Sequence, residues 1–253
     1  MSKHRNMLQR LERGCRATAS QDRQRIALAQ FDVFISTQSG DQHSLAIPLS
    51  DGSDGIDALV ETFAKHGRRA RVEYFHELYP GLAEAMENKA FDLEMNAPLM
   101  TLEPADLAKA ERRQGYQRLA PGDSELMEDF FRRQSIAFGG DGGDASLSWL
   151  PQVKAGLERG RVMAACVLHD GRPVSGAVIQ GGDDAELAGV WTLPDLQKQG
   201  LAFALCQNLL TDYFRTRGLC WLSSADKALR LYEKLGFKRI GSQRSYRFAG
   251  AES

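Results

Sequence analysis

The sequence predicts an α/β protein with a mixed, mostly antiparallel β-sheet flanked by helices, and three patterns in its second half lead to this prediction. Three apolar runs of eight or nine residues are separated by two short turns rich in Gly and Asp, which is typical of consecutive antiparallel strands. The third run leads through a loop into an apolar helix, and a further strand follows that helix. A short helix and a closing strand then end the pattern.

Each element of this second half has its own signal. The helix at 201–213 places Leu201, Leu205 and Leu209 four residues apart, which puts them on one face. Gly236 provides the left-handed stop of the helix that begins after Asp226. In order, we expect a strand at 116–119, helices at 124–138 and 147–159, strands at 160–168, 173–180 and 185–192, the helix at 201–213, a strand at 219–222, a helix at 228–235 and a strand at 237–248.

At 253 residues the chain exceeds one such unit, and its first hundred residues contain a faint echo of its last fifty. The run from Phe63 to Tyr74 parallels the run from Tyr213 to Leu222, and the run from Leu82 to Leu99 parallels the one that begins at Leu231. We therefore interpret the chain as a degenerate internal repeat with domains at 1–102, including a leading helix, and 103–253. A polar linker is expected around 103–115. The alternative is an unrelated small α/β domain at the N-terminus.

The most informative segment runs from Val190 to Ala202, where a strand ends in a loop carrying Gln197, Gly200 and Ala202. A loop that opens a helix directs unpaired backbone N–H groups and the positive end of the helix dipole outward, which suits a phosphate. Small residues at 200 and 202 let phosphates approach the backbone. The spacing matches neither a nucleoside-triphosphate P-loop nor a dinucleotide-binding fingerprint.

This loop, Gln-x-x-Gly-x-Ala at 197–202, resembles the acyl-CoA signature of the GNAT superfamily of N-acyltransferases. A second string, formed by Ala228, Leu231, Tyr232 and Leu235 to Phe237, is similar to the second cofactor motif of that family. The resemblance covers residues 115–248, and the repeat makes the chain similar to tandem members with a degenerate first half. In that half the corresponding loop at 50–55 carries two acids, so we expect no cofactor there.

The resemblance implies a GNAT fold that binds acetyl-CoA as acyl donor and transfers its acetyl group directly to an amine. The backbone along Val190 to Leu193 would pair with pantetheine like an added strand, and an N–H near Val190 or Trp191 would polarise the thioester carbonyl. The strand carrying Val190 is expected to splay from the strand at 219–222. The residues implied in cofactor binding are Val190, Trp191, Thr192, Leu193, Gln197, Lys198, Gln199, Gly200, Leu201, Ala202 and Asp226.

Two residues are candidates for moving protons. Tyr232 matches the motif tyrosine of the family and would protonate the departing thiolate, with an ordinary phenol pKa near ~10. Glu186, at the head of the central strand, is the best carboxylate for deprotonating the amine. Each of these roles has an alternative. The side chains of Tyr232 and Trp191 could serve packing alone, and Asp226 could only cap its helix. Glu186 could simply face solvent, with a water relay deprotonating the amine in its place.

Composition limits the setting. The net charge of −1 indicates no polyanionic partner, so we expect no nucleic acid, and the arginines between Arg5 and Arg25 are interpreted as a solvated helix face. Four cysteines without a CxxC pair predict reduced thiols in a cytoplasmic protein, and no apolar run is long enough for a membrane. The five histidines show no metal spacing. A homodimer is compatible with the sequence, which does not determine the oligomeric state.

Two functions from different classes follow from these observations. The first is an N-acetyltransferase acting on a primary amine of a small molecule, an amino acid or a peptide. The second is a non-catalytic module that binds acyl-CoA and regulates a partner. Tyr232 and the intact 197–202 loop favour the enzyme. A different acyl-CoA as donor stays open.

Overall fold

The computed structural model describes residues 3–37, 43–109, 114–224 and 226–250, without the side chain of Asp226. Its contacts divide the chain into two compact units. Unit 1 takes the residues up to Met100 together with Ser223–Asp226 and the chain from Arg239 onward, and unit 2 takes Thr101–Leu222 and Lys227–Lys238.

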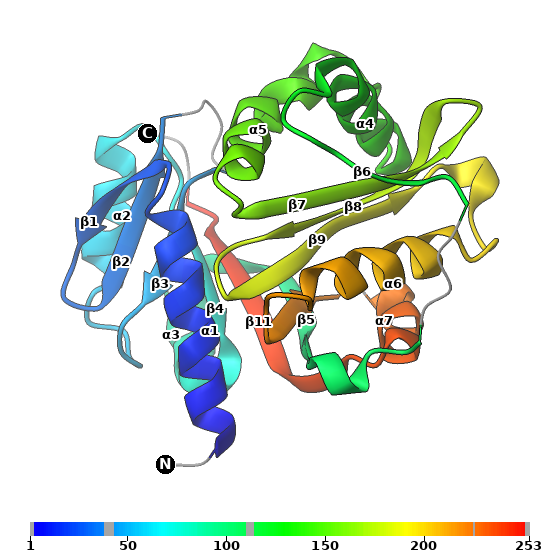
Figure 1. Ribbon diagram of the computed structural model, residues 1–253. Coiled ribbons are helices and arrows are strands. Elements are labelled where there is room, and N and C mark those ends of the chain that lie inside the picture. Colours follow the sequence, from blue (N-terminus) through cyan, green and yellow to red (C-terminus); the bar gives the residue numbers. More distant parts are fainter. Residues whose placement is uncertain (1–2, 38–42, 110–113, 225, 251–253) are drawn as a thin grey trace. The chain divides into compact units, whose positions relative to one another are not determined.

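Unit 2 contains the expected mixed sheet with helices on both faces (Figure 1). Its strands lie in the order β10-β9-β8-β7-β6, and α4 and α5 cover the face opposite to α6. The elements are β6 (Tyr116–Arg118), α4 (Ser124–Ala137), η4 (Asp144–Trp149), α5 (Leu150–Glu158), β7 (Val162–His169), β8 (Arg172–Gln180), β9 (Asp184–Thr192), η5 (Pro194–Leu196), α6 (Leu201–Tyr213), β10 (Leu219–Ser223), η6 (Asp226–Ala228) and α7 (Leu229–Leu235).

The turns and strands form where the sequence predicts them. β7, β8 and β9 pair antiparallel, and β10 returns parallel to β9 after the crossover through α6. One face of these strands packs under α4, where Met127, Phe130 and Phe131 join Cys166 and Trp191 in a buried cluster. At the edge of that helix Asp129 accepts hydrogen bonds from Arg172 of β8 and from Arg133. Pairing with β8 fixes the direction of β9, which leads into the 197–202 loop.

Unit 1 has its own set of strands and helices. Its strands lie in the order β1-β2-β3-β4-β11-β5. The elements are α1 (Lys3–Ala19), β1 (Arg23–Ala27), β2 (Phe31–Ser36), β3 (Leu45–Pro48), α2 (Ile56–Lys65), β4 (Arg71–Phe75), η2 (His76–Leu78), α3 (Leu82–Glu87), β5 (Phe91–Leu102) and β11 (Lys238–Phe248), with η3 (Pro104–Asp106) beyond β5.

The two halves of the chain repeat one order of elements. In the first half the antiparallel strands β1, β2 and β3 are followed by α2, by β4 parallel to β3, and by α3 and β5. In the second half β7, β8 and β9 are followed by α6, by β10 parallel to β9, and by α7 and β11. The internal repeat inferred from the sequence is therefore present in the order and direction of the strands.

Three features differ from the sequence analysis. The last strand, β11, pairs antiparallel with β4 of the first half, with Tyr246 opposite Val72, so the strand assigned to the domain at 103–253 lies in unit 1. The region expected to be a linker packs on α7, because the Ala108 N–H donates to Leu235 O at 3.1 Å. Finally, α1 is not simply a solvated helix. Arg16 lies 3.3 Å from buried Asp32 and 3.0 Å from buried Glu12, since α1 packs its apolar face on the sheet.

Candidate active site

The strands β9 and β10 pair at one end and then diverge. Their register joins Asp184 to Leu219 and Glu186 to Trp221, and no pairing between the two strands is recorded from Leu187 onward within the described residues. β9 nevertheless continues to Thr192 on its other side, where it pairs with β8. The expected splay is therefore present, and it leaves the β10-facing edge of Leu187–Thr192 open. We call this opening the β9–β10 gap.

A β-bulge sits in β9 beside this gap. Gly176 of β8 pairs with Trp191 and Val178 pairs with Ala188, so that Gly189 and Val190 together face the single residue Ala177. Gly189 has a φ of +56°, a left-handed conformation that glycine adopts without strain. A bulge of this kind locally interrupts the ladder and redirects the backbone of the longer strand.

Hydrogen bonds on the β8 side show which backbone groups face the gap. The Leu193 N–H donates to Val174 O at 3.0 Å, and Ser175 Oγ donates to Trp191 O at 2.7 Å. Because backbone polar groups of successive strand residues point to alternating sides, those of Thr192 and the carbonyl oxygen of Val190 point into the gap. Thr192 O there accepts a hydrogen bond from Gln197 Nε2 at 3.3 Å. The bulge interrupts this alternation at the Val190 N–H. Of the two N–H groups considered from sequence, that of Trp191 points to β8, and that of Val190 belongs to the bulge.

The 197–202 loop ends in an exposed turn that opens α6. Lys198 and Gly200 have φ values of +63° and +77°, and Gly200 is the N-cap of the helix without any side-chain cap. The first helical hydrogen bond runs from the Ala204 N–H to Gly200 O, so the N–H groups of residues 201–203 point out of the helix end. A Cβ placed on Gly200 would meet no atom within 4 Å. Open space, N–H groups and the positive dipole end meet here, which is an arrangement suited to a phosphate.

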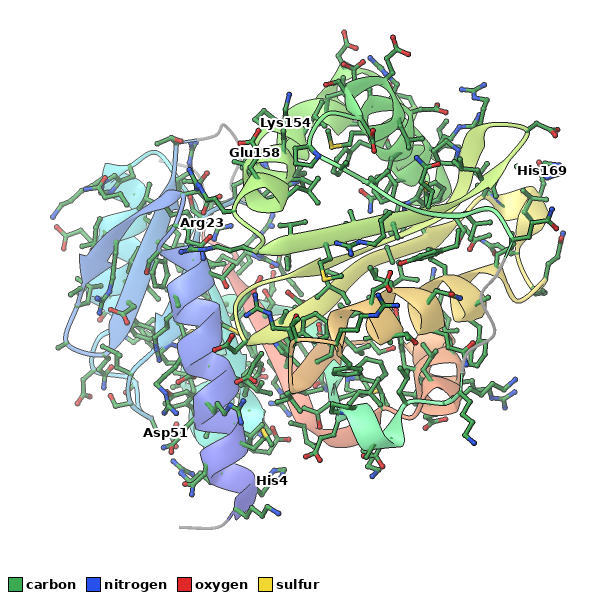
Figure 2. All side chains as sticks on the ribbon, in the orientation of Figure 1. His4, Arg23, Asp51, Lys154, Glu158 and His169 are labelled. Carbon is green, nitrogen blue, oxygen red and sulfur yellow. The ribbon has the colours of Figure 1, made fainter. Side chains whose placement is uncertain are left out.

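The corresponding loop of unit 1 is closed. There the Gly55 N–H, at the start of α2, already donates to Gln30 Oε1 at 2.6 Å, and a Cβ on Gly55 would lie 3.0 Å from that oxygen. Asp51 in the same loop accepts from the Gly81 N–H at 3.1 Å and adds a negative charge (Figure 2). The Gln30 side chain thus lies against Gly55, whereas the space around Gly200 is open.

Tyr232 lies on α7 with only 8% of its surface exposed, and its ring packs edge-on against Phe237 with centroids 5.9 Å apart. Burial, together with nearby Cys206 of α6, raises the pKa of the Tyr232 hydroxyl above its ordinary value. The assumption of an ordinary phenol pKa was therefore wrong. The same burial raises the pKa of the Cys206 thiol to about 12, so a phenol and a thiol in this environment shift in the same direction.

Glu186 stands where β9 and β10 begin to diverge. Its side chain is half-buried and accepts a hydrogen bond from Gln180 Nε2 at 3.2 Å. Four residues separate it from Val190, which corresponds to about 13 Å along an extended strand. A carboxylate at that distance reaches a group bound beside Val190 only through water.

Comparison with known proteins was made with this geometry in view. The model of the acetyltransferase (GNAT) family matches residues 121–237, which include β9, the 197–202 loop, α6 and α7. This part of the chain belongs to the GNAT family. No curated protein matches the chain.

Solved structures of GNAT proteins share the fold over most of the chain. A GCN5-related N-acetyltransferase from Kribbella flavida is 21% identical, with a TM-score of 0.80 and 96% of both chains covered. A GCN5-related N-acetyltransferase from Sphaerobacter thermophilus is 16% identical, with a TM-score of 0.63 over 88% of this chain and 78% of that one. A tandem GNAT protein from the clavulanic acid biosynthesis pathway is 12% identical, with a TM-score of 0.59 over 88% and 79%.

Some of the residues predicted to bind the cofactor have buried side chains, which leaves only their backbone for binding. The side chain of Trp191 is 2% exposed and packs edge-on against Phe130 with ring centroids 5.3 Å apart, so the core interpretation describes it. Leu201 is also buried, whereas residues 197–200 are exposed. Asp226 is part of η6, but its side chain lies outside the described residues.

The sequence analysis did not identify Gln134 of α4. Its Nε2 donates to Gly189 O at 3.1 Å and so connects the helix to the bulge. Fifty-five residues separate the two, and no local pattern signals such a contact. Ser175, fully buried, was also not identified, although its hydroxyl bonds both Trp191 O and Thr192 Oγ1.

Two further observations concern the part of the chain that the structure describes. None of its helices has the length and apolar character that crossing a bilayer requires. Nor does it bring together three His, Cys, Asp or Glu side chains in a geometry fit for a metal ion. Cys166, Cys206 and Cys220 are buried as free thiols.

Proposed function

We propose that the chain is an N-acetyltransferase that moves the acetyl group of acetyl-CoA to a primary amine of a small molecule, an amino acid or a peptide by direct attack. The observation that carries this proposal is the divergence of β9 from β10 beyond Glu186, with the bulge at Gly189 and Val190 beside the opening. Such an opening admits a thioester and an amine together, so no covalent enzyme intermediate is required. The family match supports acetyl transfer in general.

The backbone is proposed to hold the donor. The N–H groups of residues 201–203, with Gly200 and exposed Lys198 beside them, would bind the pyrophosphate. The gap-facing groups of Val190 and Thr192 would pair with the pantetheine amides in the manner of an added strand. Bound acetyl-CoA supplies an activated acetyl group, because its thioester carbon is open to attack by an amine.

The bulge is proposed to polarise the thioester carbonyl. Its role would be to direct the Val190 N–H toward the oxygen that gains negative charge as the N–C bond forms. Gln134 would fix the bulge through its bond to Gly189 O, which keeps that N–H in place before the substrate arrives. Gln134 is thus a positioning residue, since it acts through the backbone of Gly189 and Val190.

Two proton transfers complete the reaction. As the N–C bond forms and the C–S bond breaks, the amine loses one proton and the sulfur gains one. Glu186 is proposed to take the first through water, because of its distance from Val190. Tyr232 is proposed to give the second. Its raised pKa keeps it protonated at neutral pH, and a thiolate leaving into the same buried environment is made more basic as well.

A calorimetric titration of acetyl-CoA into the full chain, with free CoA and ATP as controls, tests donor binding. Gly200→Glu should abolish binding, because it places a carboxylate against the pyrophosphate and strains a φ of +77°. Gly218→Glu is the matched control, since a Cβ at that exposed glycine also meets no atom within 4 Å. Equal affinities of the two variants would refute the loop assignment.

Release of CoA thiol in the presence of amines then separates the enzyme from the non-catalytic alternative. Amine-dependent release that falls in Tyr232→Phe supports acetyl transfer. Tight binding of acetyl-CoA without amine-dependent release would favour a regulatory module. Propionyl-CoA, run in parallel, tests whether another acyl group is the preferred donor.

A further inference from the structure

A cavity of about 480 Å³ lies in unit 2, at the end of the sheet where β7 and β9 begin and α6 ends. Figure 2 marks the two ends of this sheet, with Glu158 beside the start of β7 and His169 at its far end. The cavity is at the Glu158 end, and the 197–202 loop follows the opposite end of β9. Seven residues of strand between Ala185 and Thr192 correspond to about 23 Å. The cavity is therefore separate from the candidate active site.

The charged residues lining the cavity are all cations. They are Arg118, Arg161 and Arg217, and no acidic side chain lines it. Arg217 lies 2.5 Å from Asp183, whose side chain is 89% exposed, so this ion pair is a weak surface contact. No ion pair is recorded for Arg118 or Arg161 within the described residues. The C-terminal end of α6 contributes about half a negative charge, which three guanidinium groups outweigh.

Apolar side chains also line the cavity. They are provided by Leu119, Leu157, Val162, Met163, Ile179 and Ala185. The hydroxyl of Tyr213, which also lines the cavity, is occupied by main-chain groups, since it lies 2.7 Å from Leu219 O and 3.0 Å from the Ala185 nitrogen. Besides Thr216 and main-chain groups, the arginines are the polar groups left for recognition. They share the lining with the apolar side chains named above, which we call the apolar floor.

We propose that this cavity is a second binding site, for a small organic carboxylate with an apolar body. A guanidinium group binds a carboxylate through two parallel hydrogen bonds, which gives the arginines both charge and geometric fit. The apolar floor favours a ligand whose other end is hydrophobic, because a bare inorganic anion would leave that surface in water. The volume is within the range of small-molecule sites. This site is independent of the acetyl-transfer proposal.

Phenylacetate is a suitable probe, 2-phenylethanol is its uncharged counterpart, and inorganic phosphate is an anion without an apolar body. Binding to the full-length protein would be followed by amide NMR, in which glycine signals report on both sites. We expect phenylacetate to shift the amides of Gly181 and Gly182 with saturation and to leave Gly200 unchanged. Acetyl-CoA should show the reverse pattern.

The variants Arg118→Met and Arg161→Met, combined, keep the side-chain stems and remove two charges. They should weaken phenylacetate binding about tenfold or more and leave acetyl-CoA affinity unchanged. Arg159→Met with Arg239→Met is the matched control, because both of these exposed arginines lie outside the cavity lining and the change in net charge is the same. The control should bind phenylacetate like the wild type.

Four results would overturn the proposal. They are no saturable shift at Gly181 and Gly182, equal loss of binding in both double variants, equal affinity for phenylacetate and 2-phenylethanol, or equal affinity for phenylacetate and phosphate. The last two would show that the arginines or the apolar floor, respectively, play no part. None of these results bears on acetyl-CoA binding at Gly200, so the two proposals fail separately.

Discussion

Gly189→Ala is the substitution that most directly tests the bulge in β9. With a φ of +56°, an alanine at this position is strained by about 1–2 kcal/mol. Its Cβ would also lie 2.7 Å from Gln134 Nε2, so that side chain must move and give up its bond to Gly189 O, at a cost of about 1 kcal/mol. The two effects together amount to about 2–3 kcal/mol.

This free energy can appear in two measurable ways. If the bulge is kept, the whole cost falls on stability, and the midpoint of thermal unfolding should drop by roughly 5–10 °C. If β9 instead relaxes and loses the bulge, stability recovers but the Val190 N–H leaves the position proposed for polarising the thioester carbonyl. The rate of amine-dependent CoA release should then fall by about 30- to 150-fold, with acetyl-CoA binding retained.

The assay pairs thermal unfolding with CoA-thiol release, and Gly218→Ala serves as the control because its Cβ meets no atom within 4 Å. In a Gln134→Ala background the added cost of Gly189→Ala should shrink by about 1 kcal/mol, since the bond is already gone. If Gly189→Ala matches Gly218→Ala in both unfolding midpoint and rate, the bulge has no functional role and the reasoning is wrong.

Three further predictions concern other parts of the chain. Tyr232→Phe should lower kcat about a hundredfold with CoA affinity unchanged, and an unchanged kcat would remove Tyr232 from the mechanism. Because the pKa of Tyr232 is raised, deprotonation of its hydroxyl should not lower the wild-type rate below pH ~10. Arg16→Met should lower the free energy of unfolding in urea by about 3 kcal/mol, because buried Glu12 loses the arginine that it pairs with and buried Asp32 keeps only its pair with Arg25. Exposed Arg13→Met should change it little, and equal effects of the two variants would contradict a structural role for Arg16. Burial raises the pKa of Asp129, but hydrogen bonds from two neighbouring arginines outweigh it and the net pKa is lowered. Asp129→Asn should therefore lower the free energy of unfolding by up to about 1 kcal/mol near neutral pH. The difference from the wild type should be present above pH ~4 and disappear as the pH falls through the lowered pKa. A difference that grows in acid would contradict a lowered pKa of Asp129.

The sequence by itself determined the elements of the GNAT domain and the position of its phosphate-suited loop. Alternation of apolar residues, turn signals between strands and the spacing around Gly200 are local properties, because each depends on residues within one or two turns of the chain. The same reasoning indicated the internal repeat and the absence of a matching loop in the first half. The resemblance to the family motif made Tyr232 a candidate, and the position of Glu186 at the head of the central strand made that carboxylate another.

Only the tertiary structure decided the features that depend on distant residues. The bulge at Gly189 and Val190 arises from pairing with β8 and is bonded by Gln134, fifty-five residues away. The tertiary structure also determined that the Trp191 side chain belongs to the core and that burial raises the pKa of Tyr232. The pairing of β11 with β4 joins opposite halves of the chain. Packing and strand pairing between segments remote in sequence set backbone direction and desolvation, and no local pattern encodes either quantity.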